Sequence, residues 1–117
     1  MKILLISALA LLSSCVAKHT LSGRWETAVS PNGNVTGVVF KDDNSFEGYV
    51  NKKPFVSGKY TMKGDVMTMV DNGCDGKTAI YKIVFFSRGD SMRFQPIQDS
   101  CEQRREGMKR TIMGRIR

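Results

Sequence analysis

Turn-forming residues recur along this chain at short and regular intervals, and no window between them has a long helical pattern. Glycine and asparagine tolerate positive φ and proline presets φ, so each cluster reverses the chain at low cost. The clusters lie at Ser30–Gly33, Asp42–Asn44, Asn51–Pro54, Lys63–Asp65, Asn72–Gly73 and Arg88–Asp90. This spacing predicts short strands joined by tight turns.

Eight runs of strand-like composition lie between these turns. In several of them successive residues alternate between two faces of the strand. In 45–50, Phe46, Gly48 and Val50 lie on the face opposite to that of Glu47. The predicted strands are Gly23–Val29, Val35–Lys41, Ser45–Val50, Phe55–Met62, Val66–Val70, Thr78–Phe86, Met92–Gln98 and Met108–Arg117. Only the polar segment 100–106 predicts a helix, of a single turn.

An antiparallel meander of eight short strands must protect its edges. Closing the sheet into a barrel removes the edges completely. We therefore expect an all-β fold, a small antiparallel up-and-down eight-stranded β-barrel, with a two-sheet β-sandwich as the alternative. The 117 residues allow one domain.

The N-terminus has the features of an export signal. Lys2 precedes an apolar stretch at 3–12, which is shorter than the ~20 residues that cross a bilayer, and Ser13, Ser14 and Cys15 follow. This order resembles the lipobox of bacterial lipoproteins. The resemblance implies a signal peptide at 1–14 and acyl chains, palmitate among them, on Cys15. The alternative is an ordinary secretory signal cut near Ala17.

The lipobox resemblance also sets the expected domain boundaries and location. Residues 15–21 would be a lipidated tether and residues 22–117 the barrel domain. Several acyl chains give stable anchoring where a single chain is marginal. We expect a lipid-anchored protein of the cell envelope. Val16 after the cysteine favours the outer membrane, at its periplasmic face or surface, if the organism has one.

Cysteine usage predicts one disulfide. The chain has three cysteines, and assigning Cys15 to lipid leaves Cys74 and Cys101. An exported protein lies in an oxidising compartment, where two remaining cysteines pair. The loop closed between them spans about 27 residues, worth ~3 kcal/mol of stability in the chain-entropy model.

The segment Leu21-Ser22-Gly23-Arg24-Trp25 resembles the Gly-x-Trp signature of lipocalins and related calycins. Residues 58–67 and 99–104 likewise resemble segments of small bacterial lipocalin-like lipoproteins. The resemblance implies that Trp25, after Gly23, plugs one end of the barrel and that a late arginine packs over it. Arg104 is the first candidate for this arginine and Arg105 the second.

An eight-stranded barrel has an interior that is either filled by side chains or able to hold one small ligand. Apolar and polarizable side chains suit an apolar or amphipathic molecule. The candidate ligand-binding residues are Trp25, Phe40, Phe46, Tyr60, Met67 and Met69. Plain core filling is the competing interpretation of the methionines.

The formal net charge of +7 includes Lys2 and falls by one when the signal peptide is removed. Basic residues concentrate in 104–117 and are suited to anionic lipid headgroups. Ordinary solubility of a small domain also explains such a charge. Nucleic acid is not an expected partner, because the chain is exported and no stacking aromatics interleave with the basic residues.

No catalytic constellation is present in the sequence. Ser57 has no histidine partner, because the only histidine is His19 in the tether. The segment 71–76 superficially resembles a calcium loop but lacks the spaced oxygen ligands and terminal glutamate of an EF-hand. We expect no catalytic residues, no metal, no cofactor and no enzymatic activity.

Two functions remain. The first is binding of a small apolar or amphipathic ligand by a monomeric barrel. The alternative is an envelope structural or protein-interaction module with a filled barrel. One version of this alternative is a lysozyme inhibitor, because Ser57-Gly58-Lys59-Tyr60 resembles the Ser-Gly-x-x-Tyr stretch of membrane-bound lysozyme inhibitors, one residue short. The positive charge argues against that version, since many lysozymes are basic.

Overall fold

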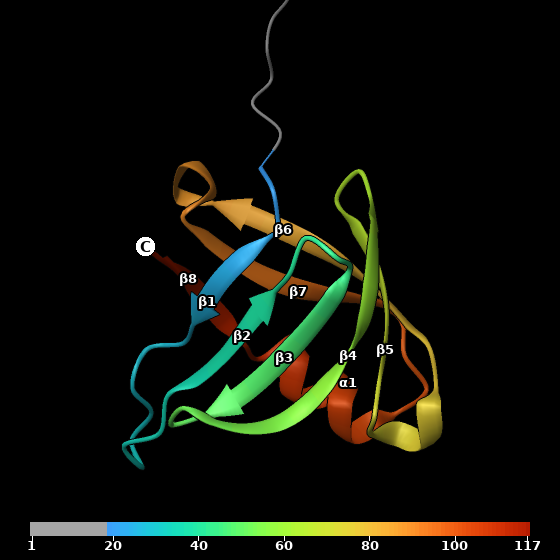
Figure 1. Ribbon diagram of the computed structural model, residues 1–117, viewed down its shortest axis with the longest axis horizontal. Coiled ribbons are helices and arrows are strands. Elements are labelled where there is room, and N and C mark those ends of the chain that lie inside the picture. The colour runs from blue at the N-terminus through green and yellow to red at the C-terminus, as the bar shows by residue number, and fades with distance from the viewer. Residues whose placement is uncertain (1–18) are drawn as a thin grey trace, which may run out of the picture.

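The computed structural model describes residues 19–117, which form eight strands, one α-helix and two 3₁₀ turns (Figure 1). The predicted signal peptide and Cys15 lie outside the described residues. In chain order the elements are β1 (Gly23–Glu26), β2 (Thr36–Phe40), β3 (Ser45–Val50), β4 (Lys53–Lys63), β5 (Val66–Asp71), η1 (Cys74–Gly76), β6 (Ala79–Phe86), η2 (Ser87–Gly89), β7 (Ser91–Gln98), α1 (Glu102–Lys109) and β8 (Ile112–Ile116).

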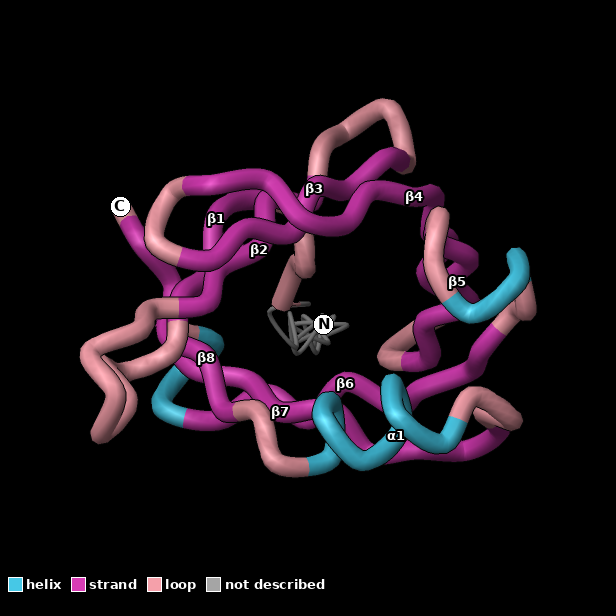
Figure 2. The backbone as a smooth tube through the Cα atoms, turned by 90° about the horizontal axis from the view of Figure 1, so that it is seen from below, coloured by secondary structure: helices cyan, strands magenta, loops and turns pink. Residues whose placement is uncertain are grey.

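The sheet is a closed antiparallel barrel. Each strand pairs with its neighbours in the sequence, and β8 returns to pair with β1, where Trp25 lies opposite Arg115. Figure 2 shows the resulting ring of strands. The predicted eight-stranded up-and-down barrel is therefore confirmed, and the sandwich alternative is wrong because no sheet edge remains open.

Turn chemistry explains the strand boundaries that differ from the prediction. Asn51 and Lys52 both have positive φ, 51° and 69°, which makes a tight two-residue hairpin. The strand β4 consequently starts at Lys53, and Pro54, predicted in the turn, lies in the strand close to a register shift. Pro96 likewise lies near a register shift in β7, where a missing N–H donor disturbs the ladder least.

The C-terminal region differs most from the prediction. The expected single turn is an eight-residue helix, α1, which takes Met108 and Lys109 from the expected last strand. Glu102 in its first turn and Lys109 in its last complement the helix dipole, and the Thr111 hydroxyl donates to the Gly107 carbonyl at 2.8 Å. Among residues 19–117, no helix has the length and apolar character needed to span a membrane.

The buried core lies entirely between Leu21 and Met113. Inward-facing side chains from all eight strands build it, as the two-residue period of strands requires. Residues 19–117 also contain every strand of the closed barrel and both cysteines of its disulfide.

The up-and-down order gives the barrel two different ends. One end holds the start of β1 and the connections β2–β3, β4–β5 and β6–β7, and we call it the tryptophan end. The other end holds the connections β1–β2, β3–β4 and β5–β6 together with α1, and we call it the helix end. In Figure 1 the chain enters at the tryptophan end, and α1 lies at the opposite end.

Candidate functional site

Trp25 lies inside the tryptophan end with no solvent exposure. Its indole N–H donates to the Leu21 carbonyl at 2.8 Å, and the Arg115 guanidinium carbon lies 4.2 Å from the ring centroid. Arg115 also donates to the carbonyls of Thr20 at 2.6 Å and Ser22 at 3.0 Å. The arginine thus packs on Trp25 and fixes the entering chain across this end.

Arg115 occupies the position that the sequence predicted for Arg104. The prediction for Arg104 was wrong, and Arg105 does not lie there either, because α1 carries both residues to the helix end. Gly23 does belong to this closure. It has a φ of 125°, and a Cβ there would lie 3.1 Å from Arg115 Nη1, so glycine leaves the room that the arginine uses.

The chain before β1 packs further on the same end. The His19 ring lies 5.4 Å from the Phe85 ring, centroid to centroid, and a Cβ at Gly89 would lie 2.3 Å from His19 Nδ1. Phe85 in turn lies 6.2 Å from the Trp25 ring. Tilted, contacting rings and satisfied donors therefore fill this end of the barrel.

A cavity of about 470 Å³ lies inside the rest of the barrel and reaches the helix end. Its wall is formed mostly by apolar side chains from the strands, and its mouth by η1 and α1. The lining includes Phe40, Phe46, Met67 and Met69, four of the six residues predicted to bind a ligand. The barrel interior is therefore not filled, which the sequence left open.

The other two predicted ligand-binding residues lie elsewhere. Trp25 does not line the cavity, because it is used in closing the tryptophan end. Tyr60 packs edge-on against Phe40, with ring centroids 5.0 Å apart, and its hydroxyl donates to the Lys41 carbonyl at 2.9 Å. Tyr60 lines a separate hollow of about 250 Å³ beside β4 and β5.

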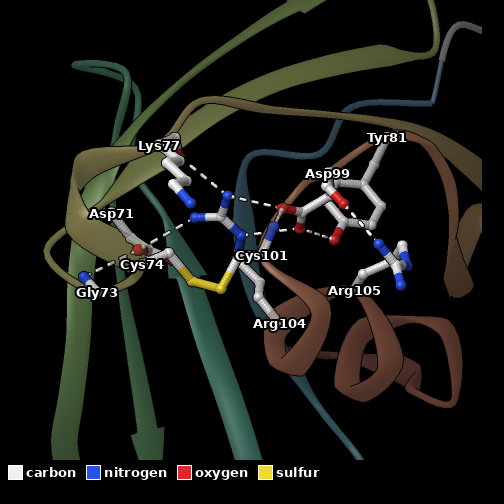
Figure 3. Close-up of a disulfide and its surroundings, with 9 residues drawn as sticks. All are labelled: Asp71, Gly73, Cys74, Lys77, Tyr81, Asp99, Cys101, Arg104 and Arg105. Carbon is white, nitrogen blue, oxygen red and sulfur yellow. Dashed lines mark hydrogen bonds and ion pairs between the residues drawn. A yellow bond between two sulfur atoms is a disulfide. The ribbon is translucent and has the colours of Figure 1, made fainter.

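The disulfide between Cys74 and Cys101 forms as predicted and lies at the cavity mouth (Figure 3). Cys74 belongs to η1 and lines the cavity, whereas Cys101 immediately precedes α1. Gln103, Gly107 and Met108 of α1 line the cavity as well. The bridge therefore joins the two elements that border the mouth.

Arg104 lies behind the disulfide between two carboxylates (Figure 3). Its Nε and Nη2 donate to the two oxygens of Asp99 at 2.8 and 2.9 Å, and Nη2 also donates to the Lys77 carbonyl at 2.9 Å. On the other side, Nη1 lies 3.2 Å from Asp71 Oδ1. The side chains of Arg104 and Asp71 are each 7% exposed, and that of Asp99 is fully buried.

These contacts set the ionisation of the buried groups. Burial alone would raise the pKa of Asp99, but hydrogen bonds from Arg104, Tyr81 and the Cys101 N–H lower that pKa below its usual 3.8. The hydrogen bond to Asp99 raises the pKa of Arg104, and burial, followed by the hydrogen bond to Asp99, raises that of Tyr81. Asp99 and Arg104 are thus held charged and Tyr81 neutral.

The structure assigns roles to residues that sequence reasoning missed. Asp71 is the last residue of β5 and lines the cavity, although in the sequence it stands directly before the turn residues Asn72-Gly73. Arg115 has its only sequence signal in the alternation of the last strand, opposite Ile112 and Ile116. Asp99 has a sequence signal only as part of the segment 99–104, which resembles lipocalin-like lipoproteins.

The basic residues of 104–117 do not share one face. Arg104 is buried and Arg115 covers Trp25, whereas Lys109 and Arg110 are exposed at the helix end. Arg117 pairs with Asp90 at the tryptophan end. The charge that is dense in sequence is therefore divided between the two ends of the barrel.

Within residues 19–117, no three side chains of histidine, cysteine, aspartate or glutamate gather closely enough to hold a metal ion. In the 71–76 segment, Asp71 Oδ1 accepts the Gly73 N–H at 2.9 Å and faces Arg104. The Gly73 N–H and Arg104 are thus the partners of this carboxylate.

Comparison with known proteins gives no relative: no protein-family model, no curated protein and no solved structure matches this chain.

Proposed function

We propose that this protein is a lipid-anchored envelope lipoprotein whose lipocalin-like barrel binds one small apolar or amphipathic molecule. The observation that carries the proposal is the cavity of about 470 Å³ at the helix end. Its size falls in the range of roughly 300–1,000 Å³ that is usual for small-molecule sites. An interior filled for structural purposes alone would leave no such space, because protein cores pack as densely as organic crystals.

The lining supports a ligand with an apolar body. Phe40, Phe46, Met67 and Met69 present aromatic rings and thioethers, and flexible methionines adapt to ligands of varied shape. The few polar groups gather at the mouth, where Asp71 and Arg104 lie. An apolar wall with a small number of placed polar groups is typical of ligand sites.

The path of the N-terminus bears on the anchoring part of the proposal. The chain enters at the tryptophan end, where Arg115 holds the carbonyls of Thr20 and Ser22. Four residue steps separate Cys15 from His19, which is at most about 14 Å of extended chain. Acyl chains on Cys15 would therefore keep the tryptophan end near the membrane and leave the cavity mouth facing away from it.

The alternative is an envelope structural or protein-interaction module. Its lysozyme-inhibitor version relies on the segment Ser57-Gly58-Lys59-Tyr60, in which Tyr60 is buried and bonded to the Lys41 carbonyl. Tyr60 is thus not presented to a protein partner. The cavity favours small-molecule binding over this alternative.

Displacement of an apolar fluorescent dye from residues 16–117 tests the binding function. We expect dye uptake with one-to-one stoichiometry and displacement by apolar and amphipathic competitors. Val38 lines the cavity, so Val38→Phe should reduce dye affinity about tenfold or more by occupying that space. Val39 on the same strand faces outward, and Val39→Phe is the matched control that should leave affinity unchanged. Equal binding by both variants would contradict the proposal.

Metabolic labelling with radioactive palmitate in a bacterial host tests the anchor. We expect label on the full chain and none on a Cys15→Ala variant. Label that persists in the variant, or no label on the full chain, would remove the lipoprotein part of the proposal and leave the binding part standing.

A further inference from the structure

The cavity has one polar corner in an otherwise apolar wall. Of the residues that line it, only Asp71 and Arg104 carry charge, and both lie at the helix end beside the disulfide (Figure 3). Both side chains are 93% buried. A ligand that fills the apolar wall would therefore bring its remaining end to this pair.

Arg104 has one donor group whose only acceptor contact in the protein is an ion pair. Its Nε and Nη2 are bonded to Asp99 and to the Lys77 carbonyl. Nη1 lies at ion-pair distance from Asp71 but has no hydrogen bond of acceptable geometry. It is the one buried side-chain nitrogen or oxygen in residues 19–117 without a hydrogen bond. A buried donor without a well-aligned hydrogen bond is costly, so a ligand oxygen at this point gains affinity by accepting from it.

The charges around this donor disfavour an anion. Asp99 takes up the charge of Arg104 through two hydrogen bonds, which leaves the carboxylate of Asp71 as the remaining negative charge at the cavity wall. Arg105 donates to the Asp99 carbonyl and pairs with Glu106, but it does not line the cavity. A carboxylate or phosphate head would therefore meet like charge at Asp71.

We propose that the cavity selects an amphipathic molecule with a small uncharged head that carries a hydroxyl group. The hydroxyl oxygen accepts from Arg104 Nη1, and its hydrogen is donated to the Asp71 carboxylate, because one hydroxyl both donates and accepts. The tail lies among the apolar side chains of the barrel wall. An ammonium head satisfies Asp71 but offers no acceptor to Arg104. This inference rests on the proposed binding function and names its ligand class.

A pair of uncharged competitors tests the head group in the unmodified domain. In dye displacement from residues 16–117, we expect 1-decanol to compete about threefold or more better than 1-methoxydecane, its methyl ether. Transfer from water alone would favour the ether, which has more apolar surface. A site that hydrogen-bonds a hydroxyl rejects an analogue without one. Equal or better competition by the ether would overturn the inference.

A charge variant separates the role of Asp71 from general hydrophobicity. Asp71→Asn keeps an oxygen that can accept the Gly73 N–H and the ligand hydroxyl but removes the negative charge. We expect affinity for decanoate to rise about tenfold, with decanol changed less than threefold. Asp75→Asn removes the same charge from an exposed position at the same end and should change neither affinity. An unchanged decanoate affinity in a folded Asp71→Asn variant would overturn the inference.

The outcomes distinguish this inference from the proposed function. If decanoate binds the unmodified domain as tightly as decanol, the binding function stands and the head-group inference fails. If neither molecule, nor any alkane of the same length, displaces the dye, the binding function itself fails. The decanol and ether comparison needs no substitution, so it decides the matter even if Asp71→Asn does not fold.

Discussion

The two ends of this barrel are closed in opposite ways. At the tryptophan end, packed side chains fill the interior, and the donors of Trp25 and Arg115 are bonded to backbone carbonyls. At the helix end, a disulfide and the Asp99–Arg104 ion pair hold the rim, and the interior behind them is hollow. One end is stabilised by packing and the other by cross-links between rim elements.

This difference indicates where a small barrel can keep space for a ligand. A short β-barrel has a small hydrophobic core. Cavities at both ends would leave too little buried apolar surface to stabilise the fold. Concentrating packing at one end and placing the disulfide at the other preserves stability while the interior stays open. Replacing side chains at either end should therefore have different consequences.

The largest expected effect is at the tryptophan end. Trp25→Ala removes a fully buried side chain and should cost about 3–5 kcal/mol of unfolding free energy. Urea unfolding followed by far-ultraviolet circular dichroism measures this loss. Because Trp25 does not line the cavity, the variant molecules that remain folded should bind dye with the affinity of the unmodified domain. A selective loss of dye affinity would show that the two ends are not independent.

Removing the disulfide should have the next largest effect. The double variant Cys74→Ser, Cys101→Ser should lose about 3 kcal/mol, because the unfolded chain is no longer constrained by the loop. The bridge also joins η1 to the start of α1 at the mouth, so dye affinity should fall as well. Unchanged affinity in this variant would mean that the disulfide stabilises the fold without shaping the mouth.

A matched pair of methionines sharpens the comparison of packing. Met92 and Met67 are both buried, but only Met67 lines the cavity. Met92→Ala should cost about 2–4 kcal/mol, and Met67→Ala at least 1 kcal/mol less, because a side chain beside empty space loses fewer contacts. Urea unfolding of the two variants checks this, and equal costs would indicate that the interior is packed uniformly.

Acid sensitivity should be the smallest of these effects and should arise largely at the helix end. The pKa of Asp99 in the fold is below its usual 3.8, so its ionised form stabilises the protein above about pH 4, and this contribution is lost as the pH falls further. Unfolding free energies at pH 5 and pH 3 measure the loss. Asp99→Asn should flatten this dependence.

Asp43 supplies the control for the acid measurement. Hydrogen bonds from Ser45 lower the pKa of Asp43, but this group lies in an exposed turn at the tryptophan end. Solvent screening makes the contribution of such a group small. Asp43→Asn should therefore flatten the pH dependence less than Asp99→Asn does. The reverse order would contradict the assignment of acid sensitivity to the helix end.

The strand count and the disulfide were predictable because each follows from a local or compartment-wide rule. Regular turn residues divided the chain into eight strands, and the expectation of an exported chain with lipid on Cys15 predicted that Cys74 and Cys101 pair. The identity of the arginine over Trp25 was not predictable in this way. It depends on the topology of the closed barrel, which places the β7–β8 connection and Arg104 at the helix end and pairs Arg115 of β8 opposite Trp25.

The candidate site was predictable in its apolar half only. Apolar and polarizable side chains in the predicted strands marked Phe40, Phe46, Met67 and Met69 as candidates, and all four line the cavity. The polar corner required tertiary structure, because Asp71 and Arg104 are far apart in sequence and each has a local explanation as a turn or helix residue. Whether the interior is hollow depends on summed side-chain volumes around a closed ring, which no local pattern reports.

Native mass spectrometry of residues 16–117, exported to a periplasm and purified without detergent, tests the central claim most directly. We predict a one-to-one adduct of small-molecule mass, either carried through purification or formed on incubation with 1-decanol, together with an intact Cys74–Cys101 bridge. A bare protein mass with the bridge intact, and no adduct after incubation, would contradict the claim that the helix end holds a ligand cavity.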